Sequence, residues 1–145
     1  MQLYCNYLDL MQLTAPEILT MPASDYMNVS QLAFFKALLL QELAQLHDNL
    51  NHTSEHLREV DAAADPADRA TQEESRGLEL RTRDRERKYL KSINSALARI
   101  TDGSYGYCAD TGEPIGLLRL IARPTTKLCL EAQEHHERRE RQFNH

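Results

Sequence analysis

Apolar residues recur at steps of three and four along two long segments of this chain. In the first segment they run from Leu32 to Ala64, and only Thr53 places a polar residue in the seam. The second segment ends in a clear apolar stripe between Leu90 and Ile100. Such spacing puts the apolar side chains on one face of a helix. The pattern therefore predicts two long helices, each with one apolar face.

An acidic, proline-containing stretch separates the two segments. It reads Asp65-Pro66-Ala67-Asp68-Arg69-Ala70. Neither flank carries enough apolar residues to form a core alone, so we expect the two to pair as an antiparallel coiled-coil hairpin. The pairing would place Gly77 opposite His56 and Leu90 opposite Leu43. Each arm of about 35 residues would reach about 50 Å at 1.5 Å per residue.

The ends of the helices and the flanking parts carry their own signals. Asn28 or Ser30 can cap the first helix, and the second is expected to run from Arg69 to about Thr101. The run Thr14-Ala15-Pro16 predicts a short helix within an upstream leader. The predicted organisation is a leader over residues 1–27, a hairpin over 28–101 with its tip at 65–70, and a base over 102–145.

The base begins where glycines interrupt the helical pattern. Tyr105–Tyr107 and Glu113–Gly116 predict two short strands, and residues 117–123 are expected to form a connector. A last helix should run from about Leu128 to Phe143. The predicted fold class is therefore mainly α: a long antiparallel coiled-coil hairpin on a small base, which holds a degenerate zinc-finger-like hairpin and a C-terminal helix.

Composition narrows the classes of function. The chain is 27% charged and 6% aromatic and has no Trp, which suits long helices with charged outer faces. A net charge of -5 argues against nucleic acid as the main partner. No apolar run approaches the roughly 20 residues of a membrane span, and no signal peptide is recognisable. Three cysteines suit a reducing compartment. We therefore expect a cytoplasmic monomer without membrane association.

Two cysteines of the base have the layout of half a zinc knuckle. Cys108 and Cys129 stand where a four-cysteine site has the first member of each pair, but Thr111 and Ala132 occupy the second positions. Tetrahedral zinc needs four donors, and two thiolates are not enough. His135 falls on the wrong helix face to replace them. We predict a finger held by packing without a metal; a redox-sensitive cysteine pair remains an alternative.

Two further groups of residues can be interpreted either as ordinary solvated surface or as a binding site. His52 and His56 share a helix face at a spacing that can bind a metal, but with no third ligand we expect solvated side chains. The run Arg81-Thr82-Arg83-Asp84-Arg85-Glu86-Arg87-Lys88 makes one side of the hairpin basic. It is either a solvated face with i,i+4 pairs such as Asp84 and Lys88, or a surface that docks on an acidic partner.

Several blocks, in order, resemble the DksA/TraR family of RNA polymerase-binding transcription factors. The resemblance covers about residues 25–142. The blocks that carry it are Asp25–Asn28, Gln31–Phe34, Asp65–Ala70, Gln72–Glu74, Leu78–Lys88, Tyr105–Cys108, Ile115–Gly116 and Arg119–Thr125.

The resemblance implies a regulator and not an enzyme. Family members insert the hairpin into the secondary channel of bacterial RNA polymerase, on the beta-prime side, and destabilise open promoter complexes without binding DNA sequence-specifically. With guanosine tetraphosphate (ppGpp) bound at the polymerase interface, they repress ribosomal RNA promoters and help activate amino-acid biosynthesis promoters in the stringent response. The family's tip motif falls on Asp65, Asp68 and Ala70, which are all present.

The chain departs from the family pattern at two sites. With only two of the four zinc cysteines, it resembles the cysteine-poor, zinc-independent DksA paralogues of pseudomonads, which take over under zinc starvation. We therefore expect no zinc cofactor. At the ppGpp site the family's arginine falls on Arg123, its two lysines on Ser92 and Gln133, and a leucine on Tyr89; Lys91 is adjacent and can substitute.

Other functions share parts of this pattern. Transcript-cleavage factors also carry an acidic tip on a stalk, and their carboxylates bind a second Mg²⁺ at the polymerase centre; this is the main alternative. An enzyme that holds Mg²⁺ with Asp65 and Asp68 would need a third ligand that the sequence does not suggest. A sequence-specific DNA-binding zinc finger is disfavoured by the acidic charge and the missing ligands.

Overall fold

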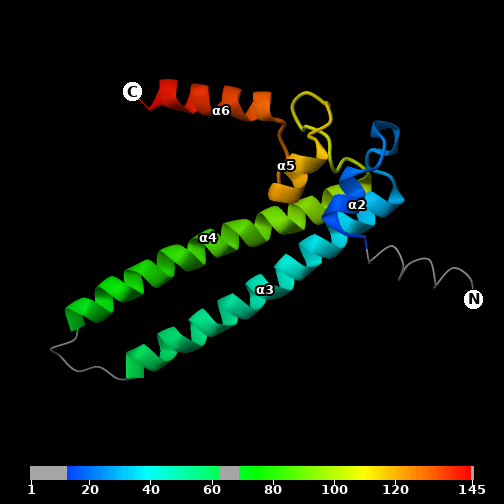
Figure 1. Cartoon of the computed structure of the whole chain (residues 1–145). Helices are drawn as coiled ribbons and strands as arrows, with labels where there is room; N and C mark the ends of the chain where they lie inside the picture. The colour runs from blue at the N-terminus through cyan, green and yellow to red at the C-terminus, as the bar shows by residue number, and fades with distance from the viewer. Residues whose placement is uncertain (1–12, 63–68, 145) are drawn as a thin grey trace, which may run out of the picture. The chain divides into compact units, whose positions relative to one another are not determined.

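The computed structural model describes residues 13–62 and 69–144, and its regular elements are all helical within those ranges (Figure 1). A short α2 and a single 3₁₀ turn precede two long helices, and two shorter helices follow. The helices are α2 (Ala15–Leu19), the 3₁₀ turn η1 (Ala23–Asp25), α3 (Val29–Ala62), α4 (Arg69–Asp102), α5 (Leu117–Ala122) and α6 (Leu130–Phe143). None of the helices in these ranges is long and apolar enough to cross a membrane.

The chain divides into two compact units, which we call the base and the stalk. The base joins the chain up to Leu39 with the chain from Asn94 onward, and the stalk runs from Leu40 to Ile93. The helices α3 and α4 therefore each contribute to both units. The three-part division predicted from the sequence stays a prediction.

The start of α3 follows from its capping residues. Asn28 Oδ1 accepts a hydrogen bond of 2.8 Å from the backbone N–H of Gln31, which satisfies one of the free donors of the first turn. Gln31 is fully buried, and its Oε1 accepts a 2.8 Å bond from the N–H of Met27. Of the two predicted caps, Asn28 is confirmed.

In the stalk, α3 and α4 run antiparallel as the predicted helical hairpin (Figure 1). Leu46 and Ile93 are the buried apolar side chains among the described residues of this unit. Elsewhere the arms are linked by polar contacts. His56 Nδ1 lies 2.9 Å from Glu79 Oε1, and the Tyr89 hydroxyl donates to Glu42 Oε2. These contacts agree with the predicted register to within a few residues, and the stalk has a polar middle.

In the base, aromatic and aliphatic side chains form a small core. The rings of Phe35 and Tyr105 are fully buried, with centroids 5.6 Å apart. The helices α2 and α5 pack on each other, and each contributes a fully buried side chain, Ile18 and Leu120 respectively. The helical start predicted at Thr14-Ala15-Pro16 is confirmed, and Glu17 completes a capping box with Thr14.

The strands predicted in the base are wrong. Tyr105–Tyr107 and Glu113–Gly116 meet in one isolated antiparallel bridge, between Tyr107 and Pro114. Gly106 and Gly116 have φ of 89° and 102°, so the backbone leaves the extended region on each side of the bridge. Pro114 has no N–H to extend the ladder.

Two other boundaries in the base also differ from expectation. The predicted connector over residues 117–123 contains the helix α5. The last helix begins at Leu130 rather than at Leu128, because Cys129 keeps an extended conformation at the N-cap.

Gly77 lies in the interior of α4, where a Cβ atom would meet open space. We expect Gly77→Ala to stabilise the folded protein by about 0.5–1 kcal/mol, because Ala loses less backbone entropy in a helix. The matched control is Gly103→Ala, which also faces open space but has φ of 85°. That substitution should destabilise by about 1 kcal/mol. Denaturant unfolding measures the change in stability for both variants. A destabilised Gly77→Ala would contradict the placement of Gly77 in the interior of α4 beside open space.

Candidate functional site

The predicted tip is only partly within the described residues. Asp65 and Asp68 lie outside them, whereas Ala70 is an exposed residue in the first turn of α4. The described helices on either side end at Ala62 and begin at Arg69. The degenerate finger in the base, in contrast, lies wholly within the described residues.

Three of the four remnant zinc-site positions, Cys108, Thr111 and Cys129, come together in this finger. Cys108 is buried and Cys129 is half-buried, and both are free thiols. Thr111 Oγ1 lies 3.9 Å from Cys129 Sγ. Ala132, the fourth position, buries its methyl group in the first turn of α6. Among the residues the structure describes, no group of three His, Cys, Asp or Glu side chains could hold a metal ion.

The Cys108 thiol sits among hydrogen-bond donors. Burial by itself would raise the pKa of this thiol, but hydrogen bonds from the Thr111 side chain and from the backbone at Cys129, Thr111 and Asp110 outweigh it and lower the pKa of Cys108 to about 6. The finger therefore stabilises a thiolate with N–H and O–H donors, which is the charge state that a zinc-bound cysteine would have.

Backbone hydrogen bonds close the loop that carries Cys108. The N–H of Cys108 donates to the carbonyl of Glu113 at 2.8 Å, and the N–H of Gly112 returns to the carbonyl of Cys108 at 2.9 Å. The neighbouring Ala109 N–H donates to the Lys127 carbonyl at 2.8 Å. This closure gives a tight turn through Asp110-Thr111-Gly112.

A segment far upstream also ties the finger, and we call it the strap (Met21–Asn28). The Tyr26 hydroxyl donates to the Gly106 carbonyl at 2.6 Å and accepts from the Gly116 N–H at 3.0 Å. Its ring meets that of Tyr107 edge to face at 5.6 Å. One phenol thus joins both sides of the finger loop. A single sequence carries no signal for this role, because Tyr26 is 80 residues from Gly106 and 90 residues from Gly116.

Arg99 holds the segment that follows α5. Its guanidinium donates to the carbonyls of Thr125 and Thr126 at 3.1 and 3.2 Å and lies 5.8 Å from the centre of the Tyr105 ring. Burial lowers the pKa of Arg99 from its usual value. The Tyr105 hydroxyl donates to the Pro124 carbonyl at 2.7 Å. The sequence did not predict these contacts of Arg99, which hold the chain just after Arg123.

The positions predicted to contact ppGpp fall in both units. In the base, Arg123 is exposed at the end of α5, and Gln133 Nε2 donates to Glu137 Oε1 at 3.0 Å. In the stalk, Lys91 and Ser92 are exposed.

Tyr89, the fifth of these positions, is engaged within the stalk. Burial, followed by the hydrogen bond to Glu42 and its charge, raises the pKa of Tyr89 to about 12. The phenol is therefore neutral near pH 7 and donates its proton to the Glu42 carboxylate. A ligand that used this hydroxyl would first have to displace that carboxylate.

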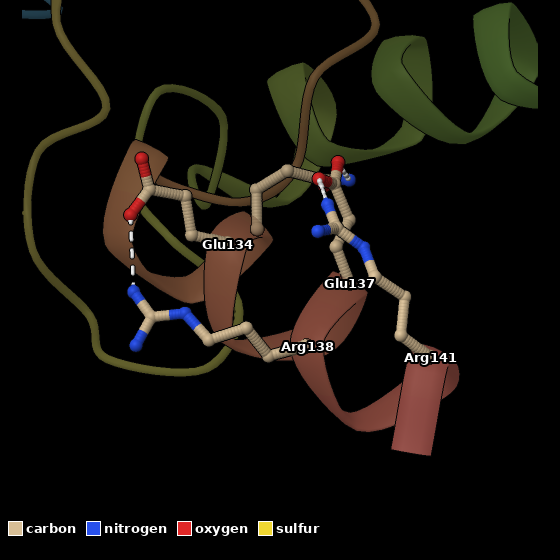
Figure 2. A network of polar contacts seen from close by, with 5 residues as sticks. Glu134, Glu137, Arg138 and Arg141 are labelled. Carbon is tan, nitrogen blue, oxygen red and sulfur yellow. Dashed lines mark hydrogen bonds and ion pairs between the residues drawn. The ribbon is translucent and has the colours of Figure 1, made fainter. Parts of the chain in front are cut away.

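The helix α6 carries charged pairs one turn apart. Figure 2 shows Glu134 beside Arg138 and Glu137 beside Arg141, at 3.4 and 3.7 Å. Exposed pairs of this kind stabilise a helix by about 0.3–0.5 kcal/mol each. His136 Nε2 lies 2.7 Å from Asp110 Oδ2 and so links α6 to the finger turn.

Comparison with known proteins identifies two family models along the chain. Residues 31–100 match "DnaK suppressor protein DksA, N-terminal domain", and residues 103–138 match "Prokaryotic dksA/traR C4-type zinc finger". The second model describes a four-cysteine finger, whereas residues 103–138 of this chain contain two cysteines, Cys108 and Cys129. The donors present do not fit a zinc ion that needs four ligands.

Curated relatives and one solved structure agree over most of their lengths. The RNA polymerase-binding transcription factor DksA of Caulobacter vibrioides (strain NA1000 / CB15N) is 54% identical over 123 residues, which cover 83% of this chain and 87% of that protein. The protein of the same name from Escherichia coli (strain K12) is 45% identical over 123 residues, or 84% and 82%. The structure of transcription factor DksA2 from Pseudomonas aeruginosa has a TM-score of 0.82 and 44% identity, with 88% and 99% covered.

The low thiol pKa of Cys108 depends on its hydrogen bonds and can be tested by removing one. Thr111→Val should raise the pKa of Cys108 from about 6 toward the ordinary value of 9.0, because burial without the hydroxyl donor disfavours the thiolate. The measurement is the ultraviolet absorbance of the thiolate during a pH titration. Cys108→Ser should abolish the low-pH step. Thr126→Val is the matched control, and the prediction fails if it shifts the step as much as Thr111→Val.

Proposed function

The chain belongs to the DksA/TraR family, and on that basis we propose that it regulates transcription by binding RNA polymerase. The observation that carries the proposal is the similarity to relatives named RNA polymerase-binding transcription factor DksA, one of which is 54% identical over 123 residues. We propose further that it acts as a regulator and not as an enzyme. Its place of action would be the cytoplasm, where RNA polymerase works.

The stalk supports entry through the secondary channel of the polymerase. The helices α3 and α4 contain 34 residues each and reach about 50 Å at 1.5 Å per residue, and the parts of them that lie in the stalk, residues 40–62 and 69–93, account for roughly 35 Å of this. A pair of helices can pass through an opening that stops the base. Asp65 and Asp68 would then carry negative charge toward the catalytic Mg²⁺ and destabilise the open promoter complex.

We propose that this regulator acts without zinc. The support is the donor set of the finger, in which Thr111 and Ala132 replace two thiols. Hydrogen bonds take over the connections that a metal makes in a four-cysteine site: the loop closes on Cys108, and the Tyr26 hydroxyl bridges Gly106 and Gly116. A chain of this kind would keep its fold under zinc starvation.

We propose that ppGpp acts as co-regulator at the interface with the polymerase. Arg123 and Lys91 are exposed cations that suit phosphate groups. Ser92 and Gln133 supply polar atoms in place of the family's lysines. Because Tyr89 is bonded to Glu42, the stalk offers a carboxylate near this position. We therefore expect a weaker ppGpp response than in relatives with two lysines, at ribosomal RNA and amino-acid biosynthesis promoters.

The second candidate is a transcript-cleavage factor that uses the same channel. It is favoured by the same feature, an acidic turn on a long stalk, because carboxylates near the catalytic centre can hold a second Mg²⁺. Cleavage of RNA in backtracked polymerase complexes separates the two functions. Stimulated cleavage that is lost in Asp68→Ala would replace the proposed function with this one.

The tip aspartates are predicted to be the effector and not the anchor. Asp68→Ala should leave affinity for RNA polymerase within about twofold of the parent, since a single exposed contact contributes little, and should abolish repression of a ribosomal RNA promoter. Competition binding measures the affinity, and transcription in vitro measures the repression. Glu73→Ala removes an exposed carboxylate of α4 beyond the tip and serves as control. Normal repression by Asp68→Ala would contradict the role.

Zinc independence predicts how the protein responds to a chelator. The purified protein should contain zinc well below one equivalent, and its melting temperature should be unchanged by a strong chelator, because no four-donor site supports the fold. A matched comparison is Thr111→Cys combined with Ala132→Cys, which restores four thiols and should make melting sensitive to the chelator. Metal analysis and thermal unfolding are the measurements. Unfolding of the parent in chelator would show that a metal holds the finger.

A further inference from the structure

Met27 has an unusual backbone conformation near the end of the strap. Its φ is 56°, the left-handed region that a residue with a Cβ atom rarely adopts. The conformation is held on both sides by tertiary contacts. The N–H of Met27 donates to the buried Gln31 at 2.8 Å, and the preceding residue, Tyr26, is bonded to the finger loop. Such strain persists only where the surrounding structure enforces it.

The side chain of Met27 packs directly on the backbone of the finger. A Cβ atom on Gly106 would stand 2.5 Å from Met27 Sδ and 2.6 Å from its Cγ. Gly106 is buried, with φ of 89°, and its carbonyl accepts hydrogen bonds from both the Tyr26 hydroxyl and the Ile115 N–H. The thioether therefore fills the space beside this glycine and next to two hydrogen bonds that close the loop.

The second methionine of the strap has a different environment. Met21 Sδ lies 3.5 Å from Gln31 Nε2 and 3.8 Å from Asn28 Nδ2, so amide groups already point at its sulfur. An oxygen added to Met21 would meet hydrogen-bond donors. An oxygen added to Met27 would meet a close-packed glycine. Both residues are half-buried, so part of each is open to solvent.

We propose that Met27 is an oxidation site through which peroxides loosen the finger. A lone pair of the thioether sulfur attacks one peroxide oxygen, the O–O bond breaks, and the remaining oxygen leaves as water after proton transfer. The sulfur loses two electrons to become a sulfoxide, and the peroxide gains them. Methionine sulfoxide reductases reverse this modification, so the site can switch in both directions.

The consequence follows from the packing. The sulfoxide is larger and polar, and it cannot stay against Gly106 without displacing the backbone. When Met27 leaves, the strap loses its contact beside the Tyr26 hydrogen bonds. The finger has no metal site with four donors that would hold its loop in place once Met27 has left. This inference concerns the fold of the base and does not depend on the proposed function at the polymerase.

The test treats the full-length protein with limiting hydrogen peroxide, reduces any disulfides afterwards, and maps sulfoxides by peptide mass spectrometry. We expect Met27 sulfoxide to form with a fall of about 4 °C in melting temperature, and reductase treatment to restore it. The variant Met27→Leu should keep its melting temperature through the same treatment. The variant Met21→Leu is the matched control and should fall as the parent does.

Three results would overturn the inference. One is that Met27 stays unmodified when half of Met21 is oxidised. Another is that Met27 sulfoxide forms with no change in melting. The third is that Met27→Leu falls as far as the parent, which would assign the effect to the oxidation of a different side chain. Hydrogen exchange at the Ile115 amide is compared in the parent before and after oxidation. The exchange should become faster after oxidation, and this measurement needs no variant.

Discussion

The constraint on which the rest of the structure depends is that the two long helices have little apolar surface to bury in the stalk. Two 34-residue helices run side by side, yet the described stalk buries only Leu46 and Ile93. In proteins, most of the stability of a helix comes from the packing of its apolar face. Both helices continue into the base, where Phe35 packs on Tyr105 and Arg99 holds two carbonyls of the following segment. The stability of the helices is therefore concentrated at the end where they join the base.

The finger is likewise short of a strong source of stability, on a smaller scale. A zinc ion contributes directly to the folding free energy of a small finger, and this finger lacks the donors for one. In its place are distributed contacts: a phenol that bonds two backbone groups, a thiolate surrounded by donors, and a carboxylate paired with His136. Each is modest by itself. Together they fix the loop with groups that do not depend on metal supply.

The helical hairpin could be predicted from the sequence, and the ties between distant segments could not. Periodicity predicted both long helices, and local capping chemistry predicted Asn28. The contacts of Tyr26 and Arg99 join segments without any repeating pattern, so a single sequence carries no signal for them. The strands failed because Gly106 and Gly116 leave the extended region. The aspartates of the tip lie outside the described residues, so their role stays a prediction.

The order of the chain gives the strap a consequence for synthesis. Tyr26 leaves the ribosome 80 residues before its partner Gly106, whereas the two arms of the stalk are close to each other in the sequence. Local contacts form early, and contacts between distant residues wait for the later one to emerge. A nascent chain can therefore pair its helices while half of the base core, including Phe35, stays open. The base closes last, when the finger segment reaches the strap.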